Sequence, residues 1–337
     1  MQTSNLLTLK NVVKHFDISG GVLDRLSFSG GKPSLRRTVV HAVNDISLEV
    51  REGETLSIVG ESGSGKSTLA RVVMGLHPMN GGEMYYRDQR IDNLGQKQFM
   101  PYRTRMQMVF QDPYASLNPR MRVKQILEEP VRFHFPAYDE SQVRERVNTV
   151  MEQVGISATW INRFPHEFSG GQRQRISLAR ALVVGPEFIV ADEPISALDV
   201  SIQAQVLNLM MEMQAGLNLT YLFISHDLSV VRHISSRVAV MYLGTLCELA
   251  ESEELFKNPR HPYTQALLSA IPEVGGDRTG RRRLQGEIPT PINLPSGCVF
   301  HGRCPYAEER CSAEIPRLLT LESGSRVACH AVEEERI

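Results

Sequence analysis

The sequence predicts an α/β fold built around a parallel sheet, because short apolar runs alternate with helical segments. LSIV at 56–59 is an apolar run with β-branched residues, and it ends at the glycine-rich stretch GESGSGKST. FIVA at 188–191 and YLFIS at 221–225 are two further apolar runs, separated by a polar stretch with helical character. The order strand, helix, strand is typical of parallel β-α-β units.

Helical segments are expected on both sides of these strands. Leu69, Val72, Val73 and Leu76 recur at helical spacing, so residues 67–76 should form a helix with one buried face. The chain between 110 and 165 is richer in Glu and Arg and has few strand signals, which predicts a helical subdomain at about 111–175 inserted into the α/β core. Residues 17–37 contain GG twice with little periodicity, and they predict a loop between early strands.

Length and charge exclude several classes of protein. A chain of 337 residues exceeds what one small core organises, so a main domain with an appended one is expected. Lys and Arg total 37 against 38 Asp and Glu, which leaves no overall basic field to hold nucleic acid. No stretch approaches the roughly 18 apolar residues of a membrane-spanning helix, and the start lacks the apolar block of a secretory signal. The protein is therefore expected to be cytosolic or peripheral to a membrane.

The glycine-rich stretch fits the phosphate-loop pattern G-x-x-x-x-G-K-[ST] between a predicted strand and a predicted helix. Glycines let backbone N–H groups surround phosphates, Lys66 supplies positive charge to the β- and γ-phosphates, and Ser67 can hold Mg²⁺. A glycine-rich turn that only caps a helix is the alternative, and the strand–loop–helix order disfavours it. The predicted nucleotide-binding residues here are Gly60, Glu61, Ser62, Gly63, Ser64, Gly65, Lys66, Ser67 and Thr68.

FIVADEP at 188–194 places two carboxylates at the end of a second buried strand. Asp192 is expected to steady Mg²⁺, and Glu193 to be the base that orients and polarises the attacking water. An apolar run that ends in DE is by itself weak, since a solvated strand end has the same appearance. The phosphate loop upstream favours the functional interpretation.

The segment FSGGQR at 168–173 resembles the signature motif of ATP-binding cassette (ABC) ATPases. Other marks of that family follow in its order: Gln111 in VFQDP, SALD at 196–199, and His226 in FISHD. The resemblance covers residues 7–255 and implies an ATP-binding domain at 1–255. It implies the P-loop NTPase architecture of these domains, with a RecA-like parallel core, an antiparallel β subdomain and a helical subdomain.

The same resemblance implies a head-to-tail dimer that holds ATP between one subunit's phosphate loop and the partner's signature motif. The signature residues expected to contact nucleotide are Ser169, Gly170, Gly171 and Gln172. Gln111 would sense the γ-phosphate and Mg²⁺, His226 would hold the γ-phosphate, and Asp199 would communicate across the dimer. Phe16 in VVKHF is the candidate for stacking on adenine, with an ordinary core position as the alternative.

The C-terminal part narrows the resemblance. NPRHPYTQALLSAIP at 258–272 and GEIPTPINLPSGCVFHGRCP at 286–305 resemble the C-terminal region of dipeptide and oligopeptide importer ATPases, which sets 256–337 apart as an importer-type region. The 17–37 insertion suits the second ATPase of such pairs. The resemblance implies docking on two transmembrane permease subunits, a heterodimer with a paralogous ATPase, a solute-binding protein that delivers substrate, and a place at the cytoplasmic face of the inner membrane. The groove for the permease's coupling helix should include Tyr114–Asn118, for which a plain surface loop is the alternative.

Four of the five cysteines fall within the last 40 residues, in the spacing C-x5-C-x6-C-x17-C. In a reducing compartment this favours metal ligation over disulfides. The spacing does not name the metal, because four thiolates suit zinc or an iron–sulfur cluster. Related importer ATPases carry a [4Fe-4S] cluster, so the resemblance favours iron, with zinc and unligated thiols as alternatives and a structural role for the metal. The expected ligands are Cys298, Cys304, Cys311 and Cys329.

The sequence therefore predicts an ATP-hydrolysing subunit that powers import of dipeptides, oligopeptides or related small solutes. A soluble ABC ATPase that acts as a clamp in DNA repair or translation is one alternative, but it predicts long coiled coils, a second cassette or a basic stripe. A regulator that binds ATP without hydrolysing it is another, but it predicts damaged catalytic residues. Asp192, Glu193, Gln111 and His226 are all present.

Overall fold

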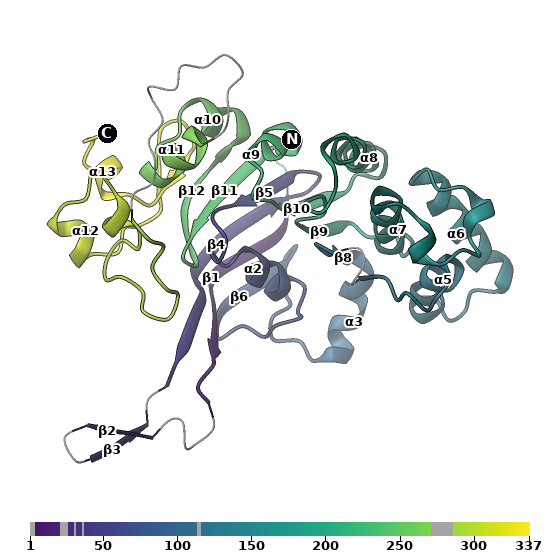
Figure 1. The fold of residues 1–337 in the computed structure, drawn as a ribbon, viewed down its shortest axis with the longest axis horizontal. Helices are drawn as coiled ribbons and strands as arrows, with labels where there is room; N and C mark the ends of the chain where they lie inside the picture. Colours follow the sequence, from purple (N-terminus) through teal and green to yellow (C-terminus); the bar gives the residue numbers. More distant parts are fainter. Residues whose placement is uncertain (1–3, 21–25, 30–31, 36, 113–115, 271–285) are drawn as a thin grey trace.

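Two large sheets organise the fold of this computed structural model, which describes residues 4–20, 26–29, 32–35, 37–112, 116–270 and 286–337 (Figure 1). One sheet has the strand order β13-β14-β12-β11-β5-β10-β9-β8, the other has the order β4-β1-β6-β7, and β2 pairs with β3. The strands are β1 (Asn5–Asp17), β2 (Leu26–Ser29), β3 (Lys32–Leu35), β4 (Val39–Arg51), β5 (Thr55–Val59), β6 (Gly81–Tyr86), β7 (Gln89–Arg90), β8 (Met106–Val109), β9 (Phe188–Asp192), β10 (Thr220–Ile224), β11 (Arg237–Tyr242), β12 (Thr245–Glu251), β13 (Leu319–Thr320) and β14 (Arg326–Val327). The α-helices are α2 (Lys66–Val73), α3 (Gln96–Arg105), α5 (Val123–His134), α6 (Glu140–Gln153), α7 (Gly170–Leu182), α8 (Val200–Leu217), α9 (Leu228–Ile234), α10 (Ser252–Lys257), α11 (Pro262–Ser269), α12 (Glu309–Ala313) and α13 (His330–Glu333); the 3₁₀ turns include η1 (Ala158–Trp160), η2 (Pro165–Glu167) and η4 (His301–Arg303).

The centre of the larger sheet is parallel, as the sequence predicts. β5, β9 and β10 are buried along their whole length, which explains why each is a continuous apolar run rather than an alternating one. Ile224 on β10 lies opposite Ile58 on β5 and opposite Asp192 on β9. The carboxyl ends of these strands therefore lie level with one another.

The antiparallel sheet packs on this core through a shared apolar cluster. That cluster joins Leu7 and Ile46 of the antiparallel sheet, Leu69 and Val73 of α2, and Ile58 of β5. β1 and β4 extend away from the body as a two-stranded ribbon (Figure 1). The loop predicted at 17–37 is wrong in part, because β2 and β3 form a hairpin there, beyond the ends of β1 and β4.

The helix predicted at 67–76 ends earlier than expected. α2 stops at Val73, and Gly75 takes a left-handed φ of +65°. Glycine adopts this conformation at no steric cost, so the chain turns here. Leu76, predicted to lie on the buried face, is instead 50% exposed.

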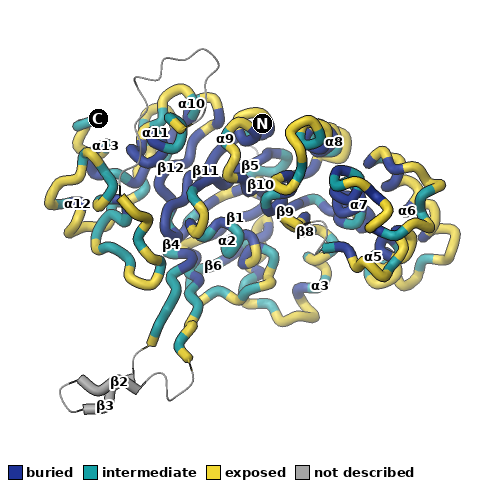
Figure 2. Tube along the Cα trace, in the orientation of Figure 1, coloured by how far each residue is buried: buried dark blue, intermediate teal, exposed yellow. Residues whose placement is uncertain are grey.

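The region predicted to be helical, 111–175, contains α5, α6 and the start of α7. These helices pack around a cluster that includes Ile126, Val147, Ile176 and Leu182. In Figure 1 they lie together beyond the β8 edge of the sheet, and Figure 2 shows their outward faces exposed. α2, by contrast, lies against the centre of the sheet.

The C-terminal region shares a core with the larger sheet. β14 pairs with β12, and β13 pairs with β14, so the tail extends the sheet. A third cluster joins Val59 and Tyr242 of the sheet to Tyr263 and Phe300 of the C-terminal region. Cys247, the cysteine outside the tail group of four, is buried in this cluster.

A buried ion pair joins Glu54, directly before β5, to Arg237, the first residue of the neighbouring strand β11. Nη1 of Arg237 lies 3.0 Å from Oε1 of Glu54, and the two side chains are 8% and 7% exposed. Glu54 also accepts the backbone N–H of Arg51 at 2.7 Å. Burial raises the pKa of the Glu54 carboxyl despite these partners.

Arg237→Met should lower the free energy of unfolding by about 3 to 5 kcal/mol, because it leaves a buried carboxylate without its partner. Arg51→Met is the control, since the Arg51–Glu251 pair is exposed and should contribute about 1 kcal/mol or less. Urea denaturation measures both. Because the pKa of the Glu54 carboxyl is raised in the folded protein, the free energy of unfolding falls as pH rises through that pKa. The loss of this free energy in Arg237→Met should therefore be smaller at pH 5 than at pH 7. Equal effects of the two variants would contradict this account.

Candidate functional site

The glycine-rich loop connects the end of β5 to the start of α2, where the sequence places it. Gly65 has a φ of +99°, and a Cβ there would lie 2.0 Å from the carbonyl oxygen of Ala42. A Cβ at Gly60 would lie 2.1 Å from the carbonyl oxygen of Met241. The loop is thus pressed against the backbone of β4 at Ala42 and of β11 at Met241, and only glycine fits at these positions.

Lys66 is folded over this loop. Its Nζ donates to the carbonyl oxygens of Gly60 at 2.8 Å and Glu61 at 2.9 Å, and lies 3.3 Å from Oγ of Ser64. Burial lowers the pKa of the Lys66 ammonium, while Glu193, Asp192 and Glu61 oppose that shift. The ammonium is thus held at the centre of the loop, where it can meet a phosphate.

Ser67 and Asp192 meet beside the loop although 125 residues separate them. The Oγ of Ser67 donates to Oδ1 of Asp192 at 2.8 Å. Asp192 is the last residue of β9, and burial raises the pKa of its carboxyl. A hydroxyl and a carboxylate oxygen at one point are ligands that suit Mg²⁺.

Three predicted catalytic side chains converge at the same edge of the sheet. Oε2 of Glu193 accepts from Nε2 of Gln111 at 3.0 Å and lies 3.1 Å from Nδ1 of His226. These residues follow β9, β8 and β10 respectively, and the N–H of Glu193 donates to the carbonyl oxygen of Ile224 at 3.0 Å. The side chain of Glu193 is 15% exposed and that of His226 is 61% exposed, so the group opens to solvent.

The signature segment FSGGQR begins α7. Ser169 is the N-cap, its Oγ accepts from the N–H of Gln172, and the Gln172 side chain accepts from the Ser169 N–H. This capping box leaves Ser169 exposed at a helix N-terminus, a position that favours anions. A Cβ at Gly171 would lie 2.4 Å from the Ile202 side chain, which places α7 tightly against α8.

The signature segment does not join the phosphate loop of the same chain. Figure 1 places α7 beyond the β8 edge of the sheet and α2 near the sheet centre. Asp199 precedes α8, and both it and its neighbour Val200 are exposed, Val200 to 82%. Ser169 and Asp199 are thus exposed residues at the starts of α7 and α8, and neither lies in the loop that precedes α2.

Phe16 lies near the end of β1 and already has ring partners. Its ring centroid is 5.3 Å from that of His77, and Nζ of Lys14 lies 4.7 Å from its centroid. The residue is half-buried. Stacking on adenine stays a prediction for Phe16.

The four tail cysteines lie near one another, and a backbone hydrogen bond joins two of them. The N–H of Cys298 donates to the carbonyl oxygen of Cys311 at 2.8 Å. Burial raises the pKa of the Cys298 thiol to about 12, and Cys329, Cys304 and Cys311 add to that shift. Among the residues that the structure describes, however, no three His, Cys, Asp or Glu side chains form a group that could hold a metal ion. The cysteines are neighbours, but the metal-site geometry expected of them is not present.

An ion pair that sequence reasoning missed joins the tail to the phosphate loop. Nη1 and Nη2 of Arg303 lie 2.7 Å and 3.1 Å from the two carboxylate oxygens of Glu61. The Glu61 side chain, predicted only as part of the nucleotide-binding loop, is thus directed to the C-terminal region. A separation of 242 residues leaves no local signal from which to predict this pair.

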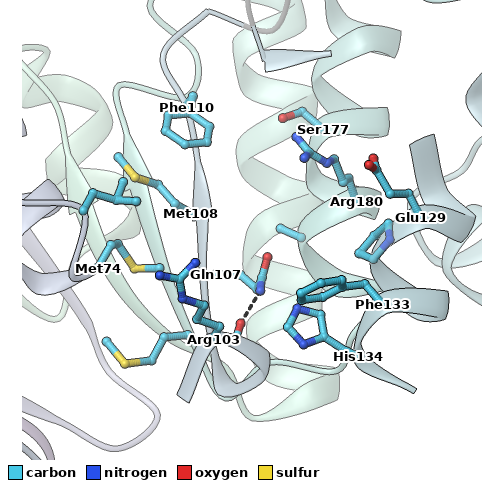
Figure 3. A pocket seen from close by; sticks show the side chains of 14 residues that line it. Met74, Arg103, Gln107, Met108, Phe110, Glu129, Phe133, His134, Ser177 and Arg180 are labelled. Carbon is cyan, nitrogen blue, oxygen red and sulfur yellow. Dashed lines mark hydrogen bonds between the residues drawn. The ribbon is translucent and has the colours of Figure 1, made fainter. Parts of the chain in front are cut away.

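A cavity of about 420 Å³ lies between the sheet edge and the helical region (Figure 3). It is lined from the turn after α2, from α3, β8, α5 and α7, and its apolar lining includes Leu76, Phe110 and Phe133. These three side chains are 50%, 37% and 64% exposed. Arg180, also in the lining, donates to the carbonyl oxygen of Ser116 at 3.0 Å. The predicted docking segment 114–118 lies beside the cavity at Ser116, while 114 and 115 lie outside the described residues.

Comparison with known proteins matches both parts of the chain. The family described as ABC transporter matches residues 43–196, and the family described as oligopeptide/dipeptide transporter, C-terminal region, matches residues 247–311. The oligopeptide transport ATP-binding protein AppF of Bacillus subtilis is 49% identical over 329 residues, which cover 96% of this chain and 97% of AppF. The dipeptide transport ATP-binding protein DppF of Escherichia coli is 48% identical over 298 residues, which cover 88% of this chain and 89% of DppF.

Solved structures show the same architecture. A dimeric ATP-binding cassette in a post-hydrolysis state, bound to ADP and Pi, superposes with a TM-score of 0.61 at 26% identity. The match covers 73% of this chain and 98% of that cassette.

Proposed function

Because this chain belongs to the ABC family, among the ATP-binding proteins of oligopeptide and dipeptide transport, we propose that it hydrolyses ATP to power import of peptides or related small solutes. The observation that carries this proposal is the convergence of Lys66, Asp192 and Glu193 at one edge of the parallel sheet. The transport proteins among its relatives favour an importer subunit over a soluble clamp in DNA repair or translation. We take residues 1–255 as the ATPase domain and 256–337 as the importer-type C-terminal region.

The residues of the loop 60–68 would bind the nucleotide's phosphates. Backbone N–H groups of the loop would surround the phosphates, and Lys66 would exchange its carbonyl partners for phosphate oxygens. Ser67, Asp192 and Gln111 would supply oxygen ligands for Mg²⁺, and the ion would neutralise charge on the transferred phosphoryl group. Phe16 would stack on the adenine in place of its contact with His77.

Glu193 would act as the general base. Its carboxylate orients a water molecule for attack on the γ-phosphorus and accepts a proton from it as ADP leaves, so that ATP and water give ADP and phosphate. Gln111 and His226, which contact the same carboxylate oxygen, fix its direction. His226 would also contact the γ-phosphate.

A second cassette would complete the site. The exposed N-terminus of α7, with Ser169, Gly170, Gly171 and Gln172, would bind the γ-phosphate held by the partner's phosphate loop, and Asp199 would lie at the interface. The dimeric state of the similar solved cassette supports this arrangement. We propose a paralogous ATPase as the partner.

The cavity between the sheet edge and α5 would receive a helix of a permease subunit. Exposed Phe110 and Phe133 offer apolar contacts, and Arg103, Arg180 and Glu129 offer charged ones. Within the described residues, no helix is long and apolar enough to cross a membrane. We propose that the chain is held at the cytoplasmic face of the inner membrane by two permease subunits, to which a solute-binding protein delivers substrate.

The four tail cysteines would hold a [4Fe-4S] cluster, with zinc as the alternative metal. Their proximity supports this assignment, because Cys329, Cys304 and Cys311 all lie close enough to Cys298 to raise the pKa of its thiol. Burial also raises the pKa of the Cys304 thiol to about 11, so these groups are poor thiolates on their own. Metal binding would require rotation of the cysteine side chains. The cluster would stabilise the tail loops rather than take part in hydrolysis.

Glu193→Gln should abolish turnover while ATP still binds. The amide keeps the shape of the carboxylate but cannot accept a proton, so hydrolysis should fall by about 100-fold or more. Steady-state phosphate release and equilibrium ATP binding measure the two effects. Glu212→Gln, on the exposed surface of α8, is the control and should hydrolyse ATP normally. Normal hydrolysis by Glu193→Gln would refute the assigned base.

Phe133→Arg should prevent assembly with the permease, because it places a charge on the most exposed apolar side chain of the cavity. A tagged, detergent-solubilised pull-down from the native host should recover two permeases and a second cassette ATPase with the unmodified chain. The same pull-down with Phe133→Arg should lose the permeases, while ATP binding stays within about twofold. Leu217→Arg, an apolar residue 43% exposed at the end of α8, is the control. Recovery of ribosomes or DNA-repair proteins would instead support the soluble clamp.

Removal of the metal by a chelator should loosen residues 286–337 without abolishing ATP binding. The third apolar cluster holds the start of this region, while the cysteine loops would depend on the metal. Limited proteolysis with mass spectrometry measures the loosening, and elemental analysis distinguishes iron from zinc. Unchanged protease resistance after metal removal would overturn the structural role. A protein purified anaerobically without iron or zinc would favour unligated thiols.

A further inference from the structure

The pair between Arg303 and Glu61 is nearly sealed from solvent. The Arg303 side chain is 6% exposed and that of Glu61 is 23% exposed, and both guanidinium Nη atoms face the carboxylate. A two-pronged contact of this kind fixes direction as well as distance. Because Arg303 belongs to the tail and Glu61 to the phosphate loop, the contact joins the two regions at Glu61.

The C-terminal region holds Glu61 by its main chain as well. The N–H of Glu61 donates to the hydroxyl oxygen of Tyr263 on α11 at 2.8 Å. Nη1 of Arg303 donates to the hydroxyl oxygen of Tyr242 at 3.2 Å, and the Tyr242 and Tyr263 rings lie 4.7 Å apart. Glu61 is therefore fixed from two sides by residues that pack together.

Glu61 in turn contacts the centre of the phosphate site. Its carbonyl oxygen accepts from Nζ of Lys66 at 2.9 Å and from the N–H of Ser64 at 3.2 Å. A shift of residue 61 would therefore move the partner of the ammonium that meets the phosphates. The carboxylate also carries a negative charge close to the position of a polyanionic ligand.

Arg303 is placed by the first cysteine loop of the tail. It lies in η4 between Cys298 and Cys304, and its N–H donates to the carbonyl oxygen of Phe300 at 3.0 Å. The Phe300 ring is buried and lies 5.3 Å from that of Tyr242. The conformation of the cysteine loop therefore determines where the guanidinium lies.

We propose that Arg303 is a positioning residue for the phosphate loop, through which the cysteine-bearing tail sets the affinity for ATP. It neutralises the Glu61 carboxylate, which would otherwise repel the phosphates and compete with them for Lys66. It also fixes the main chain of residue 61, on which Lys66 rests. This inference deepens the proposed function and rests on ATP binding at the loop.

The test is a double-mutant cycle on the full chain, with MgATP as the ligand. Arg303→Met should raise the Kd for MgATP and the KM of the assembled complex by about tenfold, and leave kcat within about twofold, because the reacting groups are untouched. Arg303→Lys keeps the positive charge but not the two-pronged guanidinium contact, so it should lose less ATP affinity than Arg303→Met. Arg310→Met, an arginine 37% exposed in the same tail, is the matched control and should bind ATP like the unmodified chain.

Repeating the measurement in a Glu61→Gln background distinguishes loss of the charge pair from a general loosening of the tail. With the repelling carboxylate removed, Arg303→Met should cost less than about threefold in ATP affinity in this background. A tenfold loss in both backgrounds would overturn the proposal, since the effect would then come from packing of the tail. Unchanged affinity in Arg303→Met would also overturn it. Failure of the unmodified chain to bind ATP would instead refute the proposed function itself.

Discussion

The register of the parallel strands is the constraint on which the rest of this structure depends. Val59 ends β5 directly before the phosphate loop, Asp192 ends β9, and Ile224 ends β10 two residues before His226. Because Ile224 lies opposite both Ile58 and Asp192, the three strand ends are level, and Ser67 reaches Asp192 across 125 residues of sequence. A slip of one residue in β9 would turn Asp192 to the other face of the sheet and separate it from the loop. The continuous apolar strands, buried on both faces, oppose such a slip because it would also disturb both apolar clusters that contain them.

The C-terminal region depends on that sheet in turn. β14 pairs with β12, and the apolar cluster around Tyr242, Tyr263 and Phe300 covers the same edge, so the tail does not fold as a separate unit. This packing brings Arg303 to the phosphate loop and places four cysteines near one another. A region recognised by its irregular sequence is thus continuous with the nucleotide-binding core. A metal among the cysteines would add to the stability that this packing gives the tail.

Local patterns were sufficient to predict the parallel core and the phosphate loop, because an apolar run and a glycine spacing can each be recognised within a short stretch of sequence. The predicted helix at 67–76 was too long, because apolar periodicity continued to Leu76 whereas Gly75 turns the chain. Leu76 instead lines the cavity that we propose for the permease. The contact of Glu61 with Arg303 could not be predicted, because it depends on how a distant loop packs on the sheet. The sequence shows that four cysteines lie close together in the tail, but the arrangement of their side chains depends on tertiary packing.

The polar groups of the site are paired with one another, and this has a consequence for nucleotide binding. Lys66 donates to two carbonyl oxygens of its own loop, and Glu193 accepts from Gln111 and contacts His226. A phosphate must replace the partners of Lys66, so only the difference between the two sets of hydrogen bonds contributes to affinity. One of those partners is the carbonyl oxygen of Glu61, whose side chain is fixed by the tail. The strength with which the loop holds Lys66 therefore depends partly on the tail. A tail that is firmly packed favours one conformation of residue 61 over the alternatives that a free loop would sample.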